Sequence, residues 1–291
     1  MREALIRYCT LFGSLALVSV AAVPILAVRS SSLGVPAPVG LGATSPVLAL
    51  GAVLLAFALF AAVAAFVARI LNIAVALFVA GWGFSVVALA CGNVQSFLWS
   101  GGAPATQAIE TLVSSVPVAV VVIVLFLGSG GLKELHGSDH PLARPTLGTL
   151  RAPQSLLFLA FGFIAVAASW GLLSSMRTGQ VLGAVFVGCW VAGTVARLAL
   201  PSAQPVLLFV GPVLCGGLVQ LVLALGTSGD LADALVAGDY PRLLWVMPLD
   251  WVGGSLAGTA FGLGFAKMFF ENSLAEKSSG SKEWGPAGSG S

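Results

Sequence analysis

The amino-acid sequence predicts an all-α integral membrane protein, a polytopic helical bundle of about eight transmembrane helices. Of its 291 residues, 58% are hydrophobic and only 8% are charged, whereas charged residues make up about 25% of an ordinary soluble domain. The apolar residues lie in blocks of roughly 20, the length of helix that crosses a hydrocarbon layer ~30 Å thick. These blocks do not alternate as barrel strands would. Helices, which satisfy their own backbone groups in lipid, are therefore predicted.

Eight apolar blocks can be marked along the chain. They cover residues 8–28, 47–67, 71–92, 111–130, 155–174, 181–200, 205–226 and 243–270. The short connection around Arg69 predicts that the second and third spans form an antiparallel hairpin. The segment 93–110 contains Phe97 and Trp99 but no Lys or Arg. It is interpreted as an outer interfacial or re-entrant piece or, more plainly, as a partly buried loop.

The basic residues predict the orientation, because cytoplasmic connections retain Lys and Arg. With the N-terminus inside, only Arg29, Arg177 and Arg242 fall outside. The inside set is Arg2, Arg7, Arg69, Lys133, Arg144, Arg151, Arg197, Lys267, Lys277 and Lys282. Both termini are therefore expected in the cytoplasm, and the abundance of Ala, Val and Gly favours a bacterial inner membrane.

The first span has two interpretations. Arg2 and Arg7 precede the apolar run "YCTLFGSLALVSVAA", which is typical of a signal peptide with a processing site at Ala21. The apolar run continues through "VPILAV" to a full membrane length, which favours a retained span. Processing would leave seven spans with unchanged loop assignments.

The expected organisation is a single transmembrane domain over residues 1–270. Two four-helix halves, 1–130 and 155–270, are joined by a cytoplasmic loop at 131–154. Residues 271–291 are rich in Ser and Gly and poor in apolar side chains. They predict a disordered tail, because such a segment cannot bury enough apolar surface to fold.

A weak internal repeat relates spans two to four to spans five to seven. The segment "ALFVAGW" at 76–82 aligns with "AVFVGCW" at 184–190, and a similar offset pairs Pro117 with Pro212. Corresponding helices would cross the membrane in opposite directions, as in the inverted repeats of secondary transporters. Chance similarity is the alternative, because short matches are frequent in a chain so rich in small apolar residues.

The ionisable residues predict no catalytic, metal or cofactor site. His136 and His140 in "HGSDH" are four apart, but Gly137 and Pro141 oppose a helix there, and a metal site would need further ligands. The cysteines are far apart in the sequence and predict buried free thiols; they are Cys9, Cys91, Cys189 and Cys215.

The remaining charges also argue against a specific ligand. Asp230, Asp233 and Asp239 lie in one predicted outer loop and are interpreted as a solvated surface, with weak cation attraction as the alternative. The net charge of +2 is too small to indicate a nucleic-acid partner.

Three polar or helix-breaking residues inside spans are candidates for a pathway. Pro117 and Pro212 each free a carbonyl one turn earlier. Broken helices line substrate sites in transporters, whereas packing kinks satisfied by neighbouring Ser or Thr are the alternative. Gln220 is expected to hydrogen-bond a neighbouring helix or, alternatively, a ligand.

Asp250 is the principal ionisable candidate. In one uninterrupted helix over 243–270 it would lie below the membrane surface, where an acid is by default a functional candidate for protons or cations. The favoured alternative starts the helix at Asp250, because Pro248 resists a helix interior. The carboxylate would then cap the helix, with Trp251 at the interface and Lys267 reaching towards the other surface.

Gly254, Gly258 and Gly262 recur every fourth residue and therefore share one helix face. Small residues on one face let another helix approach closely in lipid. The partner helix could belong to this chain or to another subunit.

These patterns support a function only in outline. The leading hypothesis is a non-enzymatic multi-span protein that acts through close helix packing as a membrane-embedded subunit or scaffold, with the lipid bilayer and other membrane helices as partners. A small secondary transporter or channel is the alternative. A lipid-directed membrane enzyme is a weaker alternative.

Overall fold

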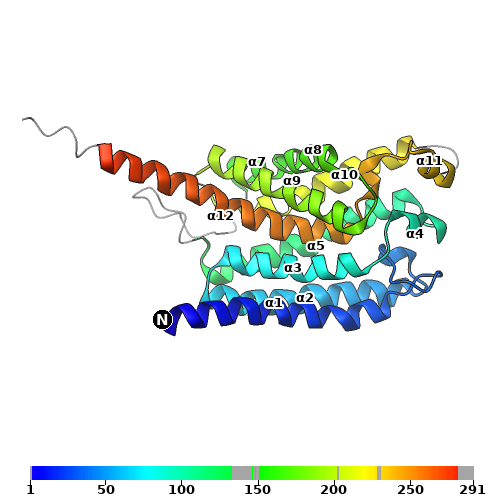
Figure 1. Ribbon diagram of the computed structural model, residues 1–291, viewed down its shortest axis with the longest axis horizontal. Coiled ribbons are helices and arrows are strands. Elements are labelled where there is room, and N and C mark those ends of the chain that lie inside the picture. The colour runs from blue at the N-terminus through cyan, green and yellow to red at the C-terminus, as the bar shows by residue number, and fades with distance from the viewer. Residues whose placement is uncertain are drawn as a thin grey trace, which may run out of the picture.

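The computed structural model describes residues 2–132, 146, 148, 151–201, 203–227 and 231–280. Its long helices lie side by side along one common direction (Figure 1). Within the described residues, β structure is limited to an isolated bridge between Ser30 and Pro36. The predicted all-α, polytopic bundle is confirmed.

The long helices account for all eight predicted spans. They are α1 (Arg2–Val28), α2 (Pro46–Ile70), α3 (Ile73–Ala90), α5 (Pro104–Ser129), α7 (Pro153–Ala160) with α8 (Gly162–Leu172), α9 (Thr178–Ala199), α10 (Gly211–Gly226) and α12 (Pro248–Gly280). Shorter pieces connect them: α4 (Val94–Trp99), α11 (Leu231–Ala237) and the 3-10 turns η1 (Gly40–Gly42), η2 (Leu207–Phe209) and η3 (Arg242–Trp245).

Seven helical segments of the described chain are long and apolar enough to cross a membrane. The eighth predicted span, α12, is not among them, because Asp250, Lys267 and its many glycines lower its hydropathy. Its position explains why this is tolerated. It packs mainly against α3 and α9, with further contacts to α5 and α10, so other helices rather than lipid surround most of it.

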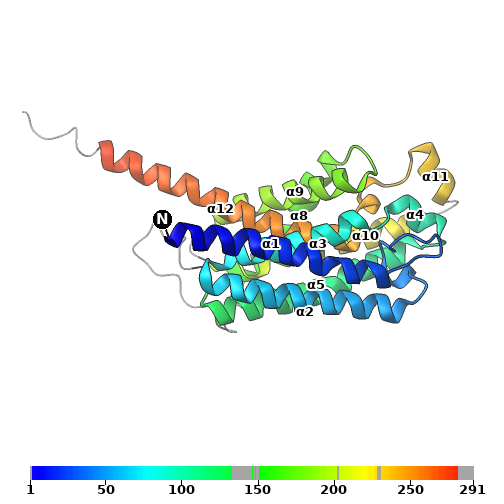
Figure 2. The ribbon, with the colours of Figure 1, turned by 60° about the horizontal axis from the view of Figure 1, so that its bottom comes forward.

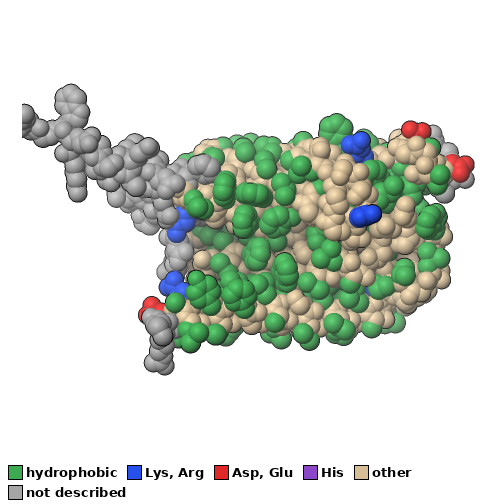
Figure 3. Space-filling view, viewed as in Figure 1, with side chains coloured by type: hydrophobic (Ala, Val, Ile, Leu, Met, Phe, Trp, Pro, Cys, Tyr) green, Lys and Arg blue, Asp and Glu red, His purple; other side chains and the backbone are tan. Residues whose placement is uncertain are grey.

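The bundle has two distinct ends. One, called the basic end here, holds the start of α1 and the α2–α3 turn with Arg69. The other, called the loop end, holds α4 and α11 (Figures 1 and 2). Hydrophobic side chains cover much of the lateral face between the two ends, and charged side chains lie towards the ends (Figure 3). A lateral apolar surface of this kind is what lipid tails require.

Two predicted spans are interrupted in the structure. The fifth is divided at Phe161 into α7 and α8, and the seventh into η2 and α10. The breaks meet, because a Cβ at Gly162 would overlap the backbone carbonyl of Gly211. Glycine at both positions lets the two chain segments touch backbone to backbone.

The course of α12 differs from the prediction in two ways. It continues past Phe270, the expected start of the tail, to Gly280, and projects beyond the other helices at the basic end (Figures 1 and 2). It also packs against α3 of the predicted first half as well as α9 of the second. The two expected four-helix halves are therefore joined through α12.

Trp251, which the capping interpretation of Asp250 places at the membrane interface, lies inside the bundle. It is fully buried and lies against α10, where a Cβ at Gly216 would come within 2.6 Å of its ring. An indole this large can be enclosed there because Gly216 has no side chain to compete for the space.

Candidate functional site

The glycine ladder of α12 meets α9 of the same chain. A Cβ at Gly254 would lie 2.6 Å from a methyl carbon of Val185. One at Gly258 would overlap the carbonyl oxygen of Phe186, and one at Gly262 would overlap that of Trp190. The close approach that the ladder predicts thus occurs within the chain.

The opposite face of α12 is matched to α3 in the same way. A Cβ at Gly253 would lie 2.7 Å from the Ser85 hydroxyl, and a Cβ at Gly81 would overlap the backbone nitrogen of Ala257. Small residues therefore line both long contacts of α12, so this helix is held between α3 and α9 with little space between the backbones.

These two contacts are related in the manner of the proposed repeat. The alignment of 76–82 with 184–190 pairs Gly81 with Cys189, and these two residues meet the adjacent positions Ala257 and Gly258. The same alignment pairs Ser85 with Gly193. Towards the loop end of α12, Ser85 meets Gly253. Towards the basic end, a Cβ at Gly262 would lie 3.1 Å from the Cα of Gly193. These are the pairings that the predicted repeat would place on either side of Ala257, and the repeat itself stays a prediction.

The contacts among the other helices can be compared under the same pairing of spans two to four with spans five to seven. The α2–α3 contact corresponds to that of α8 with α9, and the α2–α5 contact corresponds to that of α8 with α10. Helices α5 and α10 contact each other. The first helix, α1, packs outside this arrangement on α2 and α3.

Polar side chains gather where the chain enters α12 at the loop end. The amide nitrogen of Gln107 on α5 donates to the carbonyl oxygens of Leu244 at 3.1 Å and Val246 at 2.7 Å. The amide nitrogen of Gln220 on α10 donates to those of Leu243 at 2.9 Å and Val246 at 2.7 Å. Both side chains are fully buried. They satisfy backbone carbonyls of the buried 3-10 turn η3 and of Val246 directly after it, which lipid or an apolar core would leave unpaired.

Asp250 holds the other side of the same peptide group. Its Oδ2 accepts from the Met247 backbone N–H at 2.9 Å, the bond by which a residue in the first turn reaches back to the residue before a helix. The helix begins at Pro248 rather than at Asp250. Asp250 is 1% exposed, and its Oδ1 has no hydrogen-bond partner among the described residues.

We call Gln107, Gln220 and Asp250 the head cluster. The positions of nitrogen and oxygen in the two glutamine amides are assigned from their partners. Each side-chain nitrogen faces two carbonyl oxygens, and only a donor can hydrogen-bond to a carbonyl oxygen. The Oε1 atoms of both glutamines are consequently buried without a partner among the described residues, as is Oδ1 of Asp250. Three buried oxygens on α5, α10 and α12 are thus available as acceptors around one peptide group.

A second set of buried charges closes the loop end. Glu110 on α5 is 5% exposed and accepts from the backbone N–H groups of Gly40 at 2.8 Å and Leu41 at 2.9 Å. Arg29, at the end of α1, is fully buried and donates to the carbonyls of Ala37 and Pro38. The segment between α1 and α2 is therefore folded into the bundle and held by two side chains of opposite charge.

Cys91, just beyond the end of α3, lies close to these charges. Burial raises the pKa of its thiol to about 11. The Arg29 guanidinium opposes that rise, and the Asp250 and Glu110 carboxylates add to it. Arg29, Glu110 and Asp250 therefore all lie near enough to Cys91 to influence its thiol.

The sequence predictions did not include Gln107, Glu110 or Arg29 as site residues. Glu110 was placed at the edge of a loop, although α5 begins at Pro104 and contains it. A start signal was present, because Pro104 favours the first turn of a helix. Recognising it would have put Gln107 and Glu110 inside a span, where polar residues demand partners.

The two prolines occupy different settings. Pro117 lies inside α5, whereas Pro212 is in the first turn of α10, directly after η2. Near Pro117, the Ser114 hydroxyl donates to the carbonyl of Glu110, and that of Ser115 donates to the carbonyl of Leu112. Neither bond reaches the carbonyl of Val113, which Pro117 deprives of its helical donor. Neither proline belongs to the head cluster.

The other candidates do not converge. The predicted histidine pair and Asp230 lie outside the described residues, and Asp233 and Asp239 are exposed. All four cysteines are free thiols; Cys9 is exposed and the other three are buried. Among the described residues, no group of three or more His, Cys, Asp or Glu side chains could hold a metal ion.

Comparison with known proteins gives no match to a family model, to a curated protein or to a solved structure.

Proposed function

We propose that this membrane protein is a small secondary transporter of a monovalent cation, a proton or Na⁺, with Asp250 as the binding residue. The observation that carries the proposal is the buried Oδ1 of Asp250, which has no hydrogen-bond partner among the described residues. Gln107 and Gln220, which bond to the same peptide group from its other side, add two more buried oxygens without a partner among those residues. An acid within a membrane bundle is costly to bury and is by default a functional candidate. Oxygen ligands of this kind suit hard cations.

The inverted arrangement around α12 supports the same function. Secondary transporters are commonly built from two inverted repeats, and their sites lie where the repeats meet. Here α3 and α9 meet α12 at aligned positions, and the head cluster joins α5 and α10 through the backbone before α12. Movement of one repeat against the other would change access to Asp250.

We further propose that the basic end faces the cytoplasm of a bacterial cell. Arg69 and Lys267 lie there, whereas Arg177 and Arg242 lie towards the loop end, which follows the distribution expected for cytoplasmic connections. A cysteine introduced at the exposed Ser32 should react with an impermeant thiol reagent added to intact cells. One introduced at the exposed Glu3 should not. The reverse pattern would contradict this orientation.

The transport proposal is tested in proteoliposomes that contain a pH-sensitive dye. Wild-type protein is expected to move protons when a proton or Na⁺ gradient is imposed. Asp250→Asn is expected to lower this rate at least tenfold, because the amide cannot exchange a proton or supply a negative charge. Its remaining oxygen can still accept from the Met247 N–H, so the fold should survive. Asp239→Asn, which changes an exposed acid, should transport at the wild-type rate.

Two outcomes would refute the proposal. Wild-type vesicles could carry protons, Na⁺ and K⁺ no faster than empty vesicles, or Asp250→Asn could transport as fast as the wild type. Size-exclusion profiles and melting temperatures of the variants would establish that the compared proteins are folded.

A membrane-embedded subunit of a larger assembly is the second candidate. The extension of α12 beyond the bundle to Gly280 favours it (Figure 1), because a projecting helix offers a surface for another protein. Native mass spectrometry after mild-detergent purification should then find a partner on the full chain and lose it when the chain is shortened after Met268. A full-length chain without a partner would argue against this role.

A further inference from the structure

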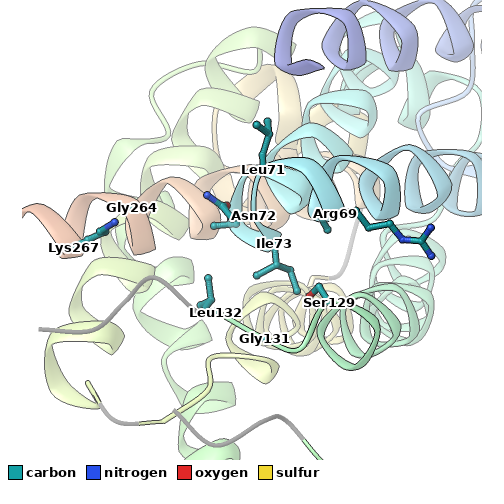
Figure 4. Close-up of a pocket in the computed structure, with 11 residues that line it drawn as sticks. Arg69, Leu71, Asn72, Ile73, Ser129, Gly131, Leu132, Gly264 and Lys267 are labelled. Carbon is teal, nitrogen blue, oxygen red and sulfur yellow. The ribbon is translucent and has the colours of Figure 1, made fainter. Parts of the chain in front are cut away.

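A polar cavity lies at the basic end, far from the head cluster along α12. It has a volume of about 260 Å³ and is bounded by the α2–α3 turn, the end of α5 and α12. Figure 4 shows Arg69 of α2 and Lys267 of α12 on opposite sides of it, with Asn72 between them. The Lys267 side chain extends towards Asn72, and the Arg69 guanidinium points outward at the rim.

An apolar groove adjoins this cavity. Its volume is about 400 Å³, and its walls include Phe78 of α3 and Phe261, Phe265 and Met268 of α12. The cavity and the groove share Asn72, Ala74 and Gly264 as wall residues. A basic cavity therefore continues directly into an apolar groove on the side of the helices.

The polar wall can accept an anion. Arg69 and Lys267 bring two positive charges from different helices. The hydroxyl oxygen of Ser129, also in the wall, is buried without a hydrogen-bond partner among the described residues. A phosphate oxygen would supply an acceptor for this hydroxyl, and its negative charge would be attracted by the two cations.

We propose that the cavity and groove together bind one anionic phospholipid. Its phosphate lies by Arg69, Lys267 and Ser129, and one acyl chain lies in the groove along Phe78 and Phe261. Basic pockets between transmembrane helices bind anionic head groups. A soluble phosphate compound would leave the apolar groove unfilled, so the two adjoining volumes favour a lipid. This inference does not depend on the transport proposal.

The groove has room for the chain next to Gly264. A Cβ added at Gly264 would meet no atom within 4 Å, in contrast to the crowded glycines nearer the loop end of α12. A larger side chain at this position would therefore fill the groove without displacing a neighbouring helix.

The head-group contact is tested by native mass spectrometry of protein incubated with phosphatidylglycerol or phosphatidylcholine in mild detergent. The wild type is expected to retain phosphatidylglycerol in preference. The double variant Arg69→Gln/Lys267→Gln should bind it about tenfold more weakly, because each basic residue near the membrane surface contributes to attraction of an anionic lipid. Arg177→Gln, at the loop end, should behave as the wild type. Added inorganic phosphate should not displace the lipid.

The acyl contact is tested with Gly264→Leu. The leucine side chain should occupy the groove and reduce retention of phosphatidylglycerol about tenfold. The melting temperature should stay close to that of the wild type. Gly51→Leu is the matched control, because a Cβ at Gly51 also meets nothing within 4 Å but Gly51 lines neither volume.

The proposal is overturned if the charge variant keeps its preference for phosphatidylglycerol, or if Gly264→Leu retains the lipid as the wild type does. Displacement of the lipid by inorganic phosphate would instead assign the cavity to a free anion.

Discussion

The two halves of α12 contain the same residue types but lie in different surroundings. From Trp251 to Ala260 the half nearer the loop end is buried throughout, whereas Phe261, Gly264 and Met268 in the other half are exposed. Glycines in the first half touch the backbones of α3 and α9. Gly264 faces open space. The glycines from Gly253 to Gly262 therefore mark helix contact, whereas Gly264 lies in the wall of a groove.

The polar groups divide in the same way. At the loop end, Gln107, Glu110 and Gln220 bond to backbone atoms in and next to the 3-10 turns η1 and η3. At the basic end, Arg69 and Lys267 surround a cavity. The loop end is thus closed by internal hydrogen bonds, and the basic end is hollowed.

The largest effect is expected from Gly258→Leu. The new Cβ would overlap the Phe186 carbonyl, and the rest of the side chain would force α9 away from α12, so the free energy of unfolding should fall by about 4 kcal/mol or more. Unfolding in mixed micelles measures this. Gly264→Leu should change the stability by less than about 1 kcal/mol. Equal losses for both variants would remove the distinction between the two halves.

The next largest effect is expected from Glu110→Ala. It leaves the buried N–H group of Gly40 and the partly buried N–H group of Leu41 without their acceptor, and each buried unsatisfied group costs about 1 to 3 kcal/mol. We expect a loss of about 3 kcal/mol, measured by the same unfolding titration. Arg69→Ala removes an exposed charge at the basic end and should cost under about 0.5 kcal/mol. A small effect at Glu110 would mean that the loop end is not held by this contact.

A smaller effect is expected from Gln220→Leu. The change preserves the bulk of the side chain and leaves the Leu243 carbonyl with only the longer bond from the Val246 N–H, while Gln107 still donates to Val246. The expected loss is about 1.5 kcal/mol. Gln107→Leu should cost a similar amount, and the double variant should lose more than the sum, because Val246 then loses both donors. If the loss in the double variant equals the sum of the two single losses, Gln107 and Gln220 do not share the role of satisfying the Val246 carbonyl.

The smallest effect on stability is expected from Asp250→Asn. The Asn oxygen can accept from the Met247 N–H, so the change in the free energy of unfolding should stay below about 1 kcal/mol. Asp250→Ala removes the acceptor and should cost more, about 1 to 2 kcal/mol. Thermal unfolding of the two variants distinguishes the contribution of the capping hydrogen bond from that of the carboxylate charge. A loss from Asp250→Asn as large as that from Asp250→Ala would show that the charge itself stabilises the fold.

The sequence predicted only in part the contacts between residues that are distant along the chain. The spacing of Gly254, Gly258 and Gly262 predicted a close helix contact, but the partner, α9, is identified only by the structure. The sequence placed Trp251 near the interface but did not predict its burial, which occurs because Gly216 on α10 leaves space for its ring. Such a space depends on a residue distant in sequence.

The sequence alone determined that the chain forms helices of membrane-crossing length, because the free energy of placing each apolar block in lipid depends on that block's own composition and length. Tertiary structure decided which helix became the centre of the bundle, where the breaks at Gly162 and Gly211 meet, and which polar groups bond around Val246. Contacts of this kind depend on the shapes and unpaired groups of segments far apart in the chain, and no single segment encodes them.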